Sequence, residues 1–284
     1  QISGLTVEEV RDLLPRTEAA ATTLTLLRDG NQIQIQTASE THLSRSLGST
    51  NQIAYLNLRE YTTVSADRVR DDYTSLVSAG SGGSGGVILD LRQNGGGSLS
   101  GAWGLTDFFG PGSVDNQIMF SLQQQSQTTD YRFGIYGSNL GITDRSKLVI
   151  LMDGSSASAS ELTSAALKDL GIATLMGGIT YGKGVGQNVV GLIGGSGVYI
   201  TSFELLSPLG NSWHNLGVSP DYSLSTVLPA NPDDDTLLQA AIEFLETGSV
   251  SQATTSRRAT KSPLLLSVPP YTHPWDGGSR QSLQ

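Results

Sequence analysis

The chain has 284 residues, including 34 glycines, and its 17 basic and 26 acidic residues give a formal net charge of −9. This length allows one large or two smaller domains, and abundant glycine without a collagen period excludes collagen, coiled coils and plain helix bundles. An acidic chain without basic clusters is a poor partner for nucleic acid. The lack of cysteine excludes disulfides, thiolate metal sites and a cysteine nucleophile.

The sequence carries neither a signal peptide nor an apolar run of the ~20 residues needed to cross a membrane. It starts at Gln1 instead of Met, which indicates a processed or trimmed form. The three histidines, His42, His214 and His273, lie too far apart in sequence for a histidine-based metal motif.

The first forty residues predict a helix followed by a β-hairpin. Residues 6–14 carry apolar side chains at helical spacing, with Thr6 and Glu9 as a capping box. Residues 23–36 contain two alternating segments joined through Asp29-Gly30, a preferred hairpin turn. A helix and a hairpin in ~35 residues are too small to form a domain alone.

The middle of the chain alternates between predicted strands and helices. Short apolar runs are typical of buried parallel strands, and apolar residues at helical spacing predict helices. The predicted strands are 53–59, 87–91, 147–152 and 174–176, the predicted helices are 66–78, 100–109 and 160–170, and a hairpin is predicted over 189–193 and 197–206. This order indicates an α/β core.

The C-terminal part changes in composition. Residues 234–247 predict a helix with an Asp-rich start and Gly248 as its end. From residue 249 onward Ser, Thr, Pro, Gln and Arg dominate. We therefore predict a tail over 249–284 that is either disordered or laid on the surface.

Three consecutive glycines, Gly95 to Gly97, follow the predicted strand 87–91. Their backbone N–H groups are not shielded by side chains, so such a turn can bind an anion or a developing oxyanion. A plain strand-to-helix turn that needs positive φ gives the same pattern. A nucleotide phosphate loop is disfavoured, because neither the Walker A nor the GxGxxG spacing is present.

A serine-rich elbow over 153–161 lies between a predicted strand and a predicted helix. Small residues at such an elbow can present a serine hydroxyl beside the helix N-terminus, where backbone amides favour negative charge. A serine that only caps the helix gives the same pattern.

A nucleophilic serine needs a base, and no histidine is near the elbow in sequence. Lys183 lies between two glycines and apolar neighbours. A desolvated lysine has a lowered pKa and can act as the base of a Ser–Lys pair. A lone lysine is more often a surface residue, so the combination of motifs matters more than any one of them.

Four motifs together resemble the C-terminal processing peptidases, or tail-specific proteases, a family of Ser/Lys endopeptidases. The matching segments are the DLRxNxGG turn at 90–96, the SASASE elbow at 156–161, the GKGxxQ loop at 182–187 and a late segment ending in PD at 207–221. They occur in the family's order, and the similarity covers residues 53–228.

The resemblance implies roles for five residues. Ser158 is the expected nucleophile, Lys183 the expected base, and Gln187 is expected to orient the lysine. The backbone amides of Gly97 and Ala159 are expected to form the oxyanion hole. The implied chemistry is acyl transfer through an acyl-enzyme, for which neither a metal nor another cofactor is expected.

The resemblance also implies an α/β fold with a ClpP/crotonase-like β-β-α spiral core and a partial PDZ domain at the N-terminus. The expected division is the C-terminal part of a PDZ domain at 1–38, the serine protease core at 39–228, a C-terminal helix at 229–248 and the tail at 249–284.

The implied function is a serine endopeptidase that cleaves proteins near their C-terminus, outside the cytoplasm, in a bacterial periplasm or envelope. Expected partners are unfolded or C-terminally exposed proteins, an adaptor or activator protein and further copies of the chain, but not nucleic acid.

Three alternatives stay open at this point. One is a catalytically silent ligand- or peptide-binding protein of the same fold. Another is a crotonase-like acyl-CoA enzyme, which would not need Lys183. The third is a Ser-His-Asp hydrolase that uses His214, which is disfavoured because the elbow lacks the GxSxG pattern.

Overall fold

The structure, a computed structural model, describes residues 22–28, 31–37, 42–47, 52–78, 85–125, 127–134, 146–192, 196–229 and 234–251. The helix predicted at 6–14 and nearly all of the predicted tail lie outside these residues. In the described part of the chain, none of the helices has the length and hydropathy needed to span a bilayer.

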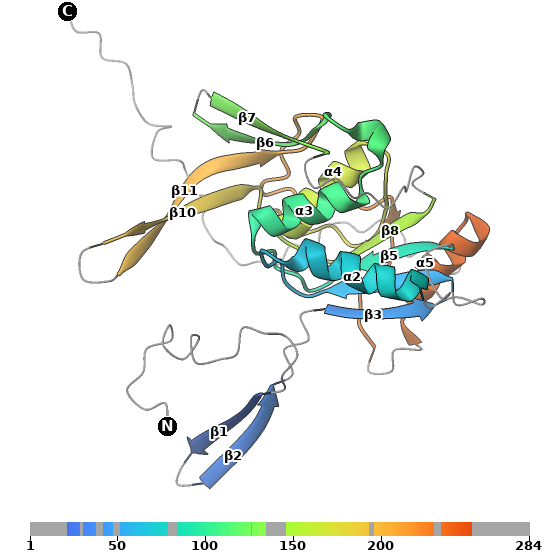
Figure 1. The fold of residues 1–284 in the computed structure, drawn as a ribbon, viewed down its shortest axis with the longest axis horizontal. Helices are drawn as coiled ribbons and strands as arrows, with labels where there is room; N and C mark the ends of the chain where they lie inside the picture. Colours follow the sequence, from blue (N-terminus) through green and yellow to red (C-terminus); the bar gives the residue numbers. More distant parts are fainter. Residues whose placement is uncertain are drawn as a thin grey trace, which may run out of the picture.

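Six of the described strands form the central sheet, in the order β12–β9–β8–β5–β4–β3 (Figure 1). Its neighbours are parallel, except that β3 runs antiparallel to β4. The strand bounds are β3 His42–Leu47, β4 Ile53–Leu58, β5 Gly86–Asp90, β8 Leu148–Met152, β9 Thr174–Gly177 and β12 Tyr222–Ser223. The predicted strands of the core are confirmed, whereas β3 and β12 were not predicted.

Helices cover both faces of this sheet, which explains the continuous apolar runs of β5 and β8. Alternate side chains of these strands point to opposite faces, so that Val87 and Leu89 join one core cluster and Ile88 joins the other. The first cluster packs against α2 (Ser65–Ser78), α3 (Leu99–Phe109) and α4 (Ala159–Asp169). The second packs against α5 (Thr236–Thr247). A three-layer α/β core results.

A second sheet of four described strands has the order β10–β11–β6–β7 and is antiparallel throughout. Its strands are β6 Ile118–Gln124, β7 Gln127–Arg132, β10 Val185–Gly191 and β11 Gly197–Leu206. The predicted hairpin is confirmed, but β10 starts four residues earlier than predicted (185 instead of 189). The hairpin extends away from the body of the molecule (Figure 1).

Two smaller features complete the described part. The hairpin predicted at 23–36 is confirmed as β1 (Thr22–Arg28) and β2 (Asn31–Thr37), which pair antiparallel. A single 3-10 turn, η1 (Gly112–Val114), follows α3.

Candidate active site

Three loops with unusual sequences meet at one edge of the central sheet. They follow β5, β8 and β9, and they contain the glycine turn, the serine elbow and the lysine loop respectively. Because the carboxyl ends of parallel strands meet at one edge of a sheet, the topology brings these loops together. This edge is where open α/β sheets place their ligands.

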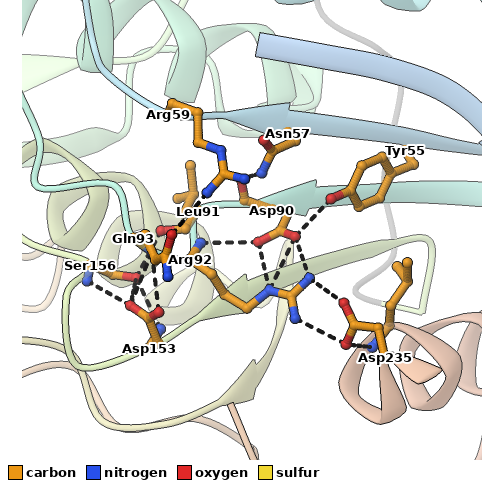
Figure 2. A network of polar contacts seen from close by, with 11 residues as sticks. Tyr55, Asn57, Arg59, Asp90, Leu91, Arg92, Gln93, Asp153, Ser156 and Asp235 are labelled. Atoms are coloured by element: carbon orange, nitrogen blue, oxygen red, sulfur yellow. Dashed lines mark hydrogen bonds and ion pairs between the residues drawn. The ribbon is translucent and has the colours of Figure 1, made fainter. Parts of the chain in front are cut away.

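A buried ion-pair network anchors the start of the glycine turn (Figure 2). The Arg92 guanidinium donates to Asp90 Oδ2 at 2.6 Å and to Asp235 Oδ2 at 2.8 Å, and all three side chains are buried. Burial alone would lower the pKa of Arg92, but its hydrogen bonds to Asp90 and Asp235 outweigh this effect and raise it. Asp235 is also the N-cap of α5, where it accepts from the Leu238 N–H. The network therefore joins the turn to a distant helix.

Tyr55 on β4 extends this network, since its hydroxyl donates to Asp90 Oδ2 at 2.8 Å. Burial, together with the negative charge of Asp90, raises the pKa of Tyr55 above its usual value. The phenol therefore stays neutral and remains a donor across the physiological pH range.

Two fully or nearly buried residues, Asn94 and Asp153, tie the glycine turn to the serine elbow. Asn94 Nδ2 donates to the Leu58 carbonyl at 2.9 Å, and Asn94 Oδ1 accepts from the Gly96 N–H at 2.9 Å. On the other side, the Asn94 carbonyl accepts from Ala157 N–H and from Ser160 Oγ. The turn and the elbow are thus fixed to each other by hydrogen bonds to the Asn94 carbonyl.

The second of these ties is Asp153, at the start of the elbow. Its carboxylate accepts from the N–H groups of Gln93, Ser155 and Ser156 at 2.8–3.2 Å. Ser156 Oγ in turn donates to the Leu91 carbonyl at 2.8 Å. Figure 2 shows Asp153 between the Gln93 and Ser156 segments.

Gly96 and Gly97 pack too closely for any side chain. A Cβ on Gly96 would lie 2.8 Å from Ser158 Cβ, and a Cβ on Gly97 would lie 2.1 Å from the Tyr61 carbonyl oxygen. Both glycines also have positive φ, at 101° and 135°. Gly97 forms an isolated β-bridge with Tyr61, in which the Gly96 carbonyl accepts from the Tyr61 N–H and the Ser98 N–H donates to the Tyr61 carbonyl. The Gly97 N–H therefore points away from Tyr61.

Ser158 has an unusual backbone conformation, with φ 56° and ψ −110° at the N-cap of α4. Non-glycine residues rarely adopt it, and such strain is concentrated at functional sites. Ser158 is half-buried between buried Ala157 and Ala159. As the first residue of α4, Ala159 has no earlier carbonyl in the helix to accept its N–H.

Glu161 connects the serine elbow to the lysine loop. Its side chain is fully buried, and Oε2 accepts from the N–H groups of Ser158 and Lys183, both at 2.8 Å. Oε1 accepts from Thr180 Oγ1 and from the Gly182 N–H, both at 2.6 Å. One carboxylate therefore fixes the backbone on both sides of the candidate site.

The late segment braces the lysine loop from behind. The Asn215 N–H donates to the Gly182 carbonyl at 2.8 Å, and the Val218 N–H donates to Thr180 Oγ1 at 2.7 Å. A Cβ on Gly184 would lie 2.8 Å from the His214 nitrogen, so this glycine permits the close approach. The Lys183 side chain is half-buried, and none of the ion pairs between described residues includes it.

All five residues predicted for the site line one cavity of about 310 Å³. The five residues are Gly97, Ser158, Ala159, Lys183 and Gln187. Apolar side chains of α3 and the second sheet line the remainder: Leu99, Val185, Tyr199, Phe203 and Leu205, beside Gly186. His214 is not among the lining residues, which disfavours the Ser-His-Asp alternative. No cluster of three or more His, Cys, Asp or Glu with metal-ligand spacing occurs in the described part of the chain.

Sequence reasoning missed four residues that hold the site together. Glu161, Asn94 and Asp153 lay inside the motifs that were recognised, and Asp235 lay outside them. The position of Glu161 three residues after Ser158 is a capping-box signal that points to a structural carboxylate. No sequence signal pairs Asp235 with Arg92, because 143 residues separate them.

The sequence of residues 52–224 matches the family described as peptidase family S41. This match covers more than half of the chain, and the chain therefore belongs to peptidase family S41. The resemblance seen in the four motifs is confirmed.

Two curated relatives carry related names. A carboxyl-terminal-processing protease of Synechocystis sp. is 32% identical over 205 residues, which cover 71% of this chain and 45% of the relative. A carboxy-terminal-processing protease of Bartonella bacilliformis is 34% identical over 145 residues, which cover 51% of this chain and 32% of the relative. The chain thus spans less than half the length of either relative.

Solved structures agree in fold. The photosystem II D1 C-terminal processing protease matches with a TM-score of 0.57 and 26% identity, covering 76% of this chain and 56% of that chain. A putative S41 protease from Bacteroides fragilis matches with a TM-score of 0.62 and 19% identity, covering 80% and 65%. The second match supports the mixed α/β fold only.

Proposed function

We propose that the chain is a serine endopeptidase that uses Ser158 as nucleophile and Lys183 as general base. One observation carries the proposal. Residues from three separate loops and the start of β10 converge on one cavity, and they are the five residues to which the family resemblance assigns roles. Membership of peptidase family S41 supports it.

In the proposed reaction, the neutral Lys183 amine accepts the Ser158 Oγ proton as Oγ attacks the scissile carbonyl carbon. The resulting ammonium then donates its proton to the amine leaving group as the C–N bond breaks. Water, deprotonated by the same lysine, hydrolyses the acyl ester and restores Ser158. Gln187 lies beside Lys183 in the cavity and is suited to orient its amine by a hydrogen bond.

The backbone N–H groups of Gly97 and Ala159 are the proposed oxyanion donors. Neither amide is used by the hydrogen bonds that hold its loop, and both residues line the cavity. Each such donor stabilises the transition state by roughly 3 kcal/mol. Because both amides belong to loops that are fixed by hydrogen bonds, they need no reorganisation during the reaction.

We assign to this chain the substrate class that the relatives' names state, which is processing at protein C-termini. Residues 39–228 would form the protease core with a ClpP/crotonase-like spiral, and 229–248 the helix that closes it. Residues 1–38 would be the C-terminal part of a PDZ domain and 249–284 a tail. A location outside the cytoplasm, an adaptor or activator protein and a homo-oligomer belong to the same proposal.

The alternative of a silent binding protein is disfavoured, because Ser158, Lys183 and Gln187 are all present and line the same cavity. A crotonase-like acyl-CoA enzyme would need no lysine at position 183.

The test is the cleavage of casein, an unfolded protein, by the chain and by its Ser158→Ala variant. Cleavage by the unchanged chain alone supports the proposal. Equal cleavage by both overturns it, because the nucleophile would then lie elsewhere. Absence of cleavage by both, with binding of casein retained, would favour the silent binding protein.

A further inference from the structure

The hairpin of β10 and β11 continues beyond the candidate site as an exposed arm. We define the arm as residues 187–192 and 196–201. β11 pairs with β6 only through Glu204–Leu206, so among the described strands the arm residues pair only with each other. In Figure 1 this hairpin projects from the body of the molecule.

The arm is apolar and uncharged in an otherwise acidic chain. No Asp, Glu, Lys, Arg or His occurs between Gly184 and Phe203. The side chains of Val190, Leu192, Val198 and Ile200 are each between 42% and 51% exposed, and Tyr199 is 70% exposed. Natural proteins protect exposed strand edges with charge, proline or a covering element. An uncharged, apolar, two-stranded arm therefore indicates a surface that is covered when the protein works.

The register divides the arm into two faces. Val190 pairs with Val198, and Asn188 pairs with Ile200, so the exposed side chains of Val190, Leu192, Val198 and Ile200 share one face of the arm. Gln187 and Tyr199 point to the opposite face, and both line the candidate cavity. A strand added at the edge of β10 would place alternate side chains on both faces.

The edge of β10 runs directly into the candidate site. The strand begins two residues after Lys183, and its first three residues line the cavity. The seven residues of β10 span roughly 20 Å at ~3.3 Å per residue. A polypeptide that pairs with this edge would thus arrive at Ser158 and Lys183 already extended.

We infer that the edge of β10 binds an extended, uncharged and apolar segment of the substrate as an added β-strand. The inference rests on the proposed function, because it takes the polypeptide that pairs with the arm to be the substrate that enters the cavity. A second copy of this protein is the competing occupant. The continuity of the arm with the cavity favours the substrate, since Gln187 and Tyr199 belong to both.

The experiment measures peptide binding to the Ser158→Ala variant, in which turnover is removed. The probe is a fluorescein-labelled, uncharged peptide of about twelve residues rich in Ala, Val and Ser, which is long enough to span β10 and the cavity. A truncated peptide of about five residues, long enough for the cavity alone, is the comparison. Fluorescence anisotropy gives both dissociation constants.

Val190→Lys places a charge on the exposed edge, and Val77→Lys on α2 is the matched control, because Val190 and Val77 are 43% and 44% exposed. We expect the long peptide to bind about tenfold more tightly than the short one, a difference of about 1.4 kcal/mol. Val190→Lys should remove most of this gain, and Val77→Lys should retain it. Ile200→Lys, on the same face, should act like Val190→Lys.

Equal binding of the two peptides, or equal effects of Val190→Lys and Val77→Lys, would overturn the inference. So would light scattering that shows Val190→Lys turning an oligomer into a monomer while the gain from peptide length persists. That result would assign the arm to a second copy. Cleavage of the long peptide by the chain with Ser158 intact tests the proposed function separately, because binding is measured without it.

Discussion

The serine side of the candidate cavity and its β10–β11 side are held in place by different interactions. On the serine side, buried carboxylates and an amide fix loop backbones by many hydrogen bonds, with Glu161 alone accepting four. On the hairpin side, the pairing of β10 with β11 holds the cavity-lining residues, and the outer part of this hairpin is exposed and apolar. Buried polar networks specify one geometry, whereas an exposed strand edge can accept partners of different sequence.

This difference suggests a division of labour. Groups that must be held to fractions of an ångström lie on loops tied to the sheet, which suits the proposed chemistry. The groups that we propose to contact a long and variable polypeptide lie on the hairpin. Substitutions of the buried groups on the serine side should therefore affect stability and turnover together. Substitutions on the exposed apolar face of the arm, such as Val190→Lys, should affect recognition alone.

The largest expected effect is on catalysis by Lys183→Ala. Loss of the proposed base should reduce casein cleavage by about 10²–10⁴-fold, with no loss of stability, because the side chain is half-buried and outside the ion pairs. Cleavage rates and thermal melting of the same preparations measure both. Lys147→Ala, at an exposed lysine before β8, is the control. Full activity of Lys183→Ala would show that Lys183 is not the base for Ser158.

Glu161→Gln tests whether the serine side is held by its buried carboxylate. The amide has only one acceptor oxygen, so in either orientation its NH₂ group faces two N–H or O–H donors. We expect a loss of about 2–5 kcal/mol in the free energy of unfolding, together with a lower kcat. Urea denaturation measures the first. Glu246→Gln on exposed α5 surface is the control, and equal stability of the two variants would refute the role of Glu161.

Two alanine substitutions within the glycine triplet give a matched comparison. Gly97→Ala forces a Cβ against the Tyr61 carbonyl at φ 135°, so we expect a loss of about 2–4 kcal/mol and a displaced amide. At Gly95 a Cβ meets nothing within 4 Å, and Gly95→Ala should change stability by less than about 0.5 kcal/mol. Denaturation midpoints and casein cleavage distinguish them. Similar behaviour of the two variants would contradict the packing described for Gly97.

Apart from the control substitutions, the smallest expected loss of stability comes from Asp235→Asn, far along the chain from Ser158 and Lys183. Asparagine can still cap α5, but it removes the negative charge opposite Arg92. Arg92 keeps Asp90, so the expected loss is about 1.5–3 kcal/mol. Thermal melting measures it. A variant as stable as the parent would show that the Arg92–Asp235 pair contributes nothing to the fold.

Much of this architecture could be predicted from sequence, for physical reasons that differ by region. The apolar runs of β5 and β8 are buried on both faces, and the patterns of α3, α4 and α5 have helical spacing. In contrast, β6 ends in two Gln residues, and β7 is polar and largely exposed, so neither shows strand-like alternation. The start of β10 was missed because Gly186 and Asn188 weaken the strand signal.

The residues that line the candidate site could be predicted from the sequence, but the buried residues whose hydrogen bonds hold them in place could not. Residue types alone point to a serine of the elbow and to Lys183 as a base, and the family resemblance singles out Ser158 and Gln187. The role of Glu161 depends on its complete burial and on four donors from two loops, which no local pattern contains.

The most direct test of the central claim is to trap the acyl-enzyme. The chain is mixed with casein peptides and quenched in acid within one turnover, and intact-mass spectrometry with peptide mapping locates any ester. We expect an acyl adduct on Ser158 that is absent in Ser158→Ala and forms more slowly in Lys183→Ala. Peptide cleavage with an adduct on another residue, or cleavage that persists in Ser158→Ala, would contradict it.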